Sequence, residues 1–101
     1  IGAGAYCDQA VGAAVATGNG DVMMRFLPTY HVVELMRGGM EPQAAAEATI
    51  QRIVDAGYQI DGGIAVIRRD GVHGGAKTGW ADTPFSYSVQ TATGNVTVPV
   101  S

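Results

Sequence analysis

The stretch Ala13 to Asp21 constrains the fold of this chain more than any other part of the sequence. Small residues suited to a strand come first, a glycine-flanked turn follows, and a helical pattern begins at its end. At such a junction the first backbone N–H groups of the helix have no partner within the helix, so they can bind an anion or a developing oxyanion. Thr17 would end the strand with its hydroxyl available, and Gly18 and Gly20 would allow a ligand to approach closely. The alternative interpretation is a plain turn whose glycines only satisfy geometry.

Composition limits the kinds of partner that such a site can bind. The 101 residues are 47% hydrophobic and 15% charged, which is typical of one globular domain or part of one. The net charge of −3 gives no basic patch for a phosphate backbone, so we expect no nucleic-acid partner. No apolar run approaches the roughly 20 residues of a membrane helix, so we expect no membrane partner. The single cysteine, Cys7, has no internal disulfide partner and is expected to be a small buried residue.

Strands and helices are segregated along the chain, which predicts an α+β layered sandwich. The second strand is almost pure Ala, Gly and Val, which favours a central strand covered on both faces. Pro28 cannot donate a backbone hydrogen bond, so we expect a kink or a fresh helix start there, and Asp70-Gly71 is a strong hairpin signal. The expected strands are Gly4–Cys7, Val11–Thr17, Gly63–Arg68, Val72–Lys77, Phe85–Thr91 and Val96–Pro99, and the expected helices run from about Asp21 to Gly38 and from Pro42 to about Ala56.

Other side chains that could carry chemistry give weaker signals. His31 and Glu34 share a helix face, but a zinc helix needs a second histidine one turn away, so no metal site is expected. His73 has no obvious partner in the sequence and is interpreted as an exposed histidine at a strand end. The glycines after the second strand resemble a dinucleotide fingerprint, but Met23 occupies the place of the third glycine, so no cofactor is expected.

Three runs in the first third of the chain match one known family. They are Gly2 to Tyr6, Gly12 to Asp21, and Met24 to Tyr30 followed by Val33 to Met36. Together they resemble the β-subunit of glycosylasparaginase, also called aspartylglucosaminidase, one of the N-terminal nucleophile hydrolases related to plant-type asparaginases. The acidic residue after Gly-Asn-Gly and the Arg-Phe-Leu-Pro run favour this branch over the isoaspartyl peptidase branch, which tends to carry Gly-His-Gly-Glu.

The resemblance implies part of a four-layer αββα sandwich and an amidohydrolase that cleaves the side-chain amide bond of asparagine-linked glycans. It implies an N-terminal threonine nucleophile, with Thr17 and Gly18 as the oxyanion hole and with Thr17, Gly18 and Gly20 as substrate contacts. No cofactor is implied. The partners would be a glycosyl-asparagine or asparagine-type substrate and an α-subunit from the same precursor, in an (αβ)2 assembly. The compartment would be the lysosome in a eukaryote, or the periplasm or cytoplasm in a bacterium.

The sequence departs from the family pattern at its start. Family members carry the nucleophile and an Arg-x-x-Asp substrate anchor before the segment that matches Gly2 to Tyr6. Every threonine here, Thr17 included, lacks the free α-amine that serves as the base. We therefore expect residues 1–101 to be a single-domain fragment, the C-terminal part of a β-subunit, that is inactive alone. The alternatives are an isoaspartyl peptidase/L-asparaginase of the same superfamily and a non-catalytic fragment.

Overall fold

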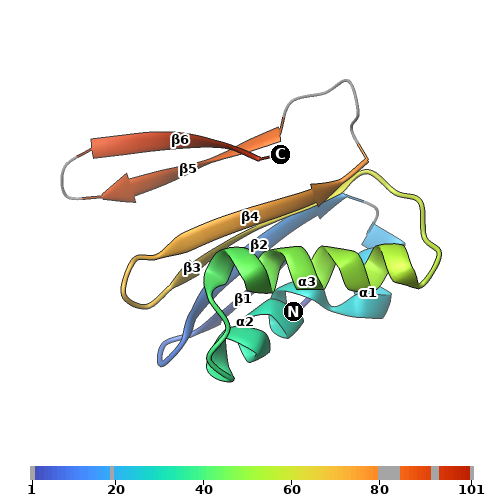
Figure 1. Cartoon of the computed structure of the whole chain (residues 1–101), viewed down its shortest axis with the longest axis horizontal. Helices are drawn as coiled ribbons and strands as arrows, with labels where there is room; N and C mark the ends of the chain where they lie inside the picture. The colour runs from blue at the N-terminus through green and yellow to red at the C-terminus, as the bar shows by residue number, and fades with distance from the viewer. Residues whose placement is uncertain (1, 19, 80–84, 92–93, 101) are drawn as a thin grey trace.

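A computed structural model describes residues 2–18, 20–79, 85–91 and 94–100 of the chain. Within them the predicted order of two strands, a helical region and four further strands is confirmed (Figure 1). The elements are β1 (Ala5–Asp8), β2 (Gly12–Gly18), α1 (Gly20–Phe26), α2 (Pro28–Arg37), α3 (Pro42–Asp55), β3 (Gly62–Arg68), β4 (His73–Thr78), β5 (Phe85–Thr91) and β6 (Gly94–Val100).

Two antiparallel sheets make up the β structure. The first has four strands in the order β1-β2-β3-β4, so β2 lies centrally as predicted, and the second consists of the hairpin β5-β6. The hairpin signal at Asp70-Gly71 is confirmed, because β3 and β4 pair antiparallel around it. The Gly71 N–H donates to the Arg68 carbonyl at 2.9 Å and closes this turn.

The helices and the β5-β6 hairpin lie on opposite faces of the four-stranded sheet (Figure 1). Two adjacent glycines of β4 show this, since neighbouring residues of a strand face opposite sides. A Cβ on Gly74 would lie 2.6 Å from the Gln43 backbone in α3, whereas a Cβ on Gly75 would lie 2.8 Å from the Tyr87 ring in β5. The chain thus forms three layers of a mixed α/β fold with antiparallel sheets.

The main hydrophobic core fills the space between the helices and the four-stranded sheet. Val32 and Val33 of α2 and Ile64 of β3 are completely buried there. Ala45 and Ala46 of α3 are also fully buried, and their small side chains allow that helix to approach the sheet closely.

Two burial predictions are wrong for the described residues. The helices cover the face of β2 that carries Ala14, but Val15 on the opposite face is 58% exposed. Cys7 of β1 is exposed as well. The hairpin causes this difference, because its aromatic rings pack on Gly63 of β3 and Gly75 of β4 and leave the outer face of β1 and β2 open.

Of the two outcomes expected at Pro28, a kink or a new helix, the structure shows a new helix. Leu27 separates α1 from α2 with a left-handed backbone (φ 46), and Pro28 occupies the first turn of α2, where its missing N–H costs nothing. α1 and α2 are therefore separate helices with separate contacts. No helix in the described part of the chain is long and apolar enough to cross a membrane.

Candidate functional site

The predicted turn lies at the junction of β2 and α1. β2 ends at Gly18 and α1 begins at Gly20, while Asn19 between them lies outside the described residues. Thr17, Gly18 and Gly20 are all exposed. The strand and the helix expected from the sequence are thus present on either side of Asn19, and the three candidate residues lie together at one end of the sheet.

Only glycine fits at position 18. Its φ of +136° lies outside the range that side chains tolerate, and a Cβ there would lie 2.5 Å from the Asp61 carbonyl oxygen. The same Cβ would lie 2.7 Å from Cα of Gly62, the residue that pairs with Gly18 across β2 and β3. The backbone at Gly18 therefore approaches β3 too closely for any side chain to intervene.

An aromatic ring that the sequence reasoning missed covers Gly63, the cross-strand partner of Thr17. Thr17 pairs with Gly63, and residues opposite each other in an antiparallel ladder point to the same face. A Cβ on Gly63 would lie 2.6 Å from the Phe85 ring, so this face is the one covered by the hairpin. The signal that could have revealed Phe85 is the Gly62-Gly63 pair, where a neighbouring ring occupies the space of an absent side chain.

α1 is held against the turn by a small hydrophobic cluster of its own. The cluster consists of Val22, Met23 and Ile53, separate from the main core. The Met23 methyl group lies 2.7 Å from the Cβ position of Gly62 and 3.2 Å from that of Gly18. Met23 therefore fills the space above this glycine pair and ties the first turns of α1 to the end of β2.

The histidines have other partners than the sequence suggested. Glu34 pairs with Arg37 at 3.2 Å, one turn along α2. Burial, and to a smaller extent the charge of Arg52, lowers the pKa of His31. The prediction of an exposed, unpartnered His73 is wrong, because its Nδ1 lies 2.7 Å from the Tyr87 hydroxyl and the side chain is half-buried. Burial also raises the pKa of Tyr87.

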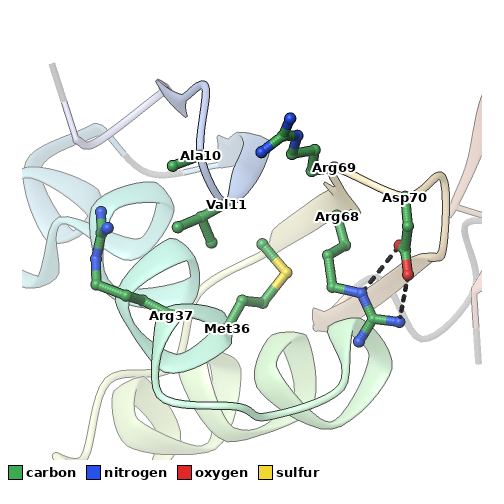
Figure 2. A pocket seen from close by; sticks show the side chains of 7 residues that line it. All are labelled: Ala10, Val11, Met36, Arg37, Arg68, Arg69 and Asp70. Atoms are coloured by element: carbon green, nitrogen blue, oxygen red, sulfur yellow. Dashed lines mark hydrogen bonds and ion pairs between the residues drawn. The ribbon is translucent and has the colours of Figure 1, made fainter.

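A shallow hollow of about 630 Å³ lies at the opposite end of the sheet from the turn (Figure 2). It is next to Gly12, which pairs with Arg68, whereas Gly18 lies six residues further along β2, about 20 Å away. Its lining residues are Ala10, Val11, Met36, Arg37, Arg68, Arg69 and Asp70.

The arginines of this hollow are largely neutralised by nearby carboxylates. Arg68 pairs with Asp70 at 2.8 Å and with Glu41 at 3.2 Å, and Figure 2 shows the first of these pairs. The bonds from Arg68 lower the pKa of the Asp70 carboxyl. Arg37 is bonded to both Asp8 and Glu34. The hollow therefore has no excess of positive charge to attract an anion.

No metal centre is present among the residues that the structure describes, since no three His, Cys, Asp or Glu side chains lie close enough together to hold an ion. Thr17 and Gly18 lie at the end of β2, with Met23 of α1 on the helix face of the sheet and the Phe85 ring, beside Gly63, on the hairpin face. The accessible residues at this strand end suit a ligand held by the Thr17 hydroxyl and by backbone N–H groups.

Comparison with known proteins gives a consistent family assignment. A family model described as asparaginase matches residues 1–97. The chain is 48% identical over 90 residues to a probable isoaspartyl peptidase/L-asparaginase of Arabidopsis thaliana, and this match covers 89% of the chain and 24% of the relative. It is 51% identical over 87 residues to a putative N(4)-(beta-N-acetylglucosaminyl)-L-asparaginase of Drosophila persimilis, covering 86% of this chain and 22% of the relative. The chain thus spans about a quarter of the length of these relatives.

Proposed function

Because the chain belongs to the asparaginase family, we propose that it supplies part of the active site of an amidohydrolase that cleaves the side-chain amide bond of glycosylated asparagine. The observation that carries this proposal is the accessible turn at the end of β2. Thr17 and Gly18 are exposed there, and Gly18 pairs with Gly62 across the β2–β3 ladder in a conformation that favours glycine. These two residues are the proposed donors to the oxyanion.

In the proposed reaction a threonine with a free α-amine, supplied by a part of the protein outside residues 1–101, attacks the carbonyl carbon of the side-chain amide. The carbonyl oxygen becomes negatively charged as the new C–O bond forms, and donors from Thr17 and Gly18 stabilise it. The α-amine takes the proton of the threonine hydroxyl and passes it to the leaving nitrogen as the C–N bond breaks, and water then hydrolyses the acyl-enzyme and restores the hydroxyl. Donors of this kind typically stabilise the transition state by roughly 2.7 to 4 kcal/mol each.

Three threonines in the described part of the chain, Thr17, Thr29 and Thr49, do not suit the role of nucleophile. Thr29 and Thr49 are buried, with exposures of 0% and 1%. The Thr49 hydroxyl donates to the Ala45 carbonyl at 2.8 Å, inside α3. Thr17 is an internal residue of β2, so its amine is part of a peptide bond. We therefore propose that the isolated chain is inactive and that the fragment completes its site with an α-subunit and the preceding part of the β-subunit, within a four-layer sandwich in an (αβ)2 assembly.

The second candidate function is that of an isoaspartyl peptidase/L-asparaginase. The Arabidopsis relative with that name is nearly as similar, at 48%, as the Drosophila relative at 51%. The Gly18 to Asp21 turn and the run from Arg25 to Pro28 support the glycosylated substrate instead, because both follow the glycosylasparaginase pattern. The side chains that contact the leaving group would decide between the two.

The test is a substrate comparison on the full-length gene product. Purified protein is assayed for aspartate release from aspartyl-glucosamine, free asparagine and an isoaspartyl dipeptide. We expect the highest kcat/KM on aspartyl-glucosamine and no turnover by residues 1–101 alone. A preference for the isoaspartyl dipeptide would establish the second candidate, and absence of turnover on all three substrates would contradict both. Turnover by the isolated chain above a Thr17→Val control would contradict the proposal that the nucleophile lies outside residues 1–101.

A further inference from the structure

We propose that Arg52 is a positioning residue for the turn that carries Thr17 and Gly18, acting through α1. The proposal rests on the proposed function, because it concerns the geometry of the same oxyanion donors. Arg52 lies on α3 and belongs to none of the motifs that the sequence analysis singled out.

Arg52 holds the C-terminal end of α1. Its Nη1 donates to the Phe26 carbonyl at 3.0 Å, and its guanidinium carbon lies 5.3 Å from the centroid of the Phe26 ring. The same ring meets Tyr58 edge to face at 5.4 Å between centroids. Phe26, the last residue of α1, is thus fixed to α3 and to the segment that leads into β3.

Met23 holds α1 from the other side. Its methyl group fills the space above Gly18 and Gly62, at the last pair of the β2–β3 ladder. If α1 moves, the Met23 methyl group therefore either leaves this space or displaces the backbone of Gly18. The turn is coupled in this way to the position of the whole helix.

α1 depends on these contacts because it is too short to be stable by itself. It has seven residues, and isolated helices of that length are unstable in water. Leu27 breaks the helix with a left-handed backbone, so α2 does not continue and stiffen it. The hydrophobic cluster under α1 has Val22, Met23 and Ile53 as its buried members, and partly buried residues such as Phe26 and Tyr58 pack against it. The bond from Arg52 adds a polar contact at the end of the helix that lies furthest from Gly18.

Oxyanion donors need accurate placement, since a displacement of about 1 Å can reduce a rate by about a hundredfold. We test Arg52 in the full-length gene product with the variant Arg52→Met, which keeps the aliphatic stem but removes the charge and the donors. We expect kcat to fall by about tenfold to a hundredfold with KM within about twofold. Arg52→Lys keeps a cation near the ring and one donor, so it should recover most of the lost kcat.

Hydrogen exchange gives a readout that does not depend on catalysis. Arg52→Met should speed amide exchange across Gly20–Phe26 and leave Pro28–Arg37 unchanged. Arg69→Met removes an exposed arginine at the opposite end of the sheet and serves as the matched control, with neither kcat nor exchange in α1 expected to change.

The outcomes separate this inference from the proposed function. If Arg52→Met changes neither kcat nor exchange in α1, or if KM rises while kcat stays constant, the positioning role is overturned. The proposed function still stands in that case, provided Thr17→Val lowers kcat. If Thr17→Val leaves kcat unchanged, the proposed function fails, whatever exchange shows for α1. Loss of kcat in Arg52→Met with no recovery in Arg52→Lys and with faster exchange throughout the protein would indicate general unfolding, and it also overturns the positioning role.

Discussion

The Met23 methyl group lies 2.7 Å from the point where Gly62 would carry a Cβ, so these two residues occupy one space between them. The contact joins α1 to the end of β3 directly beside Gly18. It explains why a strand end at this position carries glycine although glycine weakens strands. The geometry of the proposed oxyanion turn thus depends on side-chain packing behind it as well as on the turn itself.

The first prediction concerns this shared space. Gly62→Ala should destabilise the protein by about 1 to 3 kcal/mol, because the new methyl group forces Met23 out of its place. In a Met23→Ala background the same substitution should cost clearly less, since the obstructing methyl group is gone. Urea unfolding of the four proteins in this double-mutant cycle measures the difference. If Gly62→Ala lowers the free energy of unfolding equally in both backgrounds, the Met23 methyl group is not what excludes a side chain at position 62.

The second prediction compares the two glycines that flank Asn19. Gly18→Ala should destabilise by more than about 2 kcal/mol and abolish activity, because of its φ of +136° and the Asp61 carbonyl 2.5 Å from the added atom. Gly20→Ala should change stability by less than about 1 kcal/mol, because the site is open and alanine favours a helix. Thermal unfolding and kcat of both variants test this. Equal losses of stability at the two positions would contradict the steric difference between them.

The third prediction uses two buried threonines. The Thr29 hydroxyl has no hydrogen-bond partner among the described residues, whereas that of Thr49 donates to the Ala45 carbonyl. Thr29→Val should therefore leave stability unchanged or raise it, and Thr49→Val should lower it by about 1 kcal/mol. Denaturation midpoints in urea distinguish them. A larger loss for Thr29→Val than for Thr49→Val would be incompatible with these contacts.

The fourth prediction concerns pH. Burial lowers the pKa of His31 below its ordinary value of 6.5, so the unfolded chain binds a proton more readily than the folded one. Stability is therefore retained above that value and falls as the pH drops through the pKa of the folded state. His31→Gln should reduce this decline between about pH 7.5 and 5, measured by urea unfolding. An identical pH dependence in variant and wild type would show that another group controls it.

The sequence predicted the features that depend on neighbouring residues. Asp70-Gly71 specifies the β3–β4 hairpin because its backbone preferences suit a tight turn. Pro28 marks the start of α2 because its ring prevents continuation of the preceding helix. The junction at Thr17 and Gly18 was located by the change from strand to helix periodicity. All three signals act within a few residues along the chain.

The features that the sequence missed depend on contacts between distant segments. The burial of His73 comes from Tyr87, which lies 14 residues away on another sheet. The exposure of Val15 follows from where the hairpin packs, and the small side chains of β2 do not reveal that position. The packing of Phe85 on Gly63, the cross-strand partner of Thr17, was missed for the same reason. Local patterns do not specify which strand pair a hairpin covers.

The central claim is that Thr17 stabilises the oxyanion in an amide hydrolysis. The most direct test is kcat of Thr17→Val on aspartyl-glucosamine in the full-length gene product, with Thr97→Val on the exposed face of β6 as the control. The substitution keeps the shape of the side chain and removes its hydroxyl. We predict that kcat falls by about a hundredfold or more for Thr17→Val and stays within about twofold for Thr97→Val. A Thr17→Val enzyme with the kcat of the wild type would contradict the account.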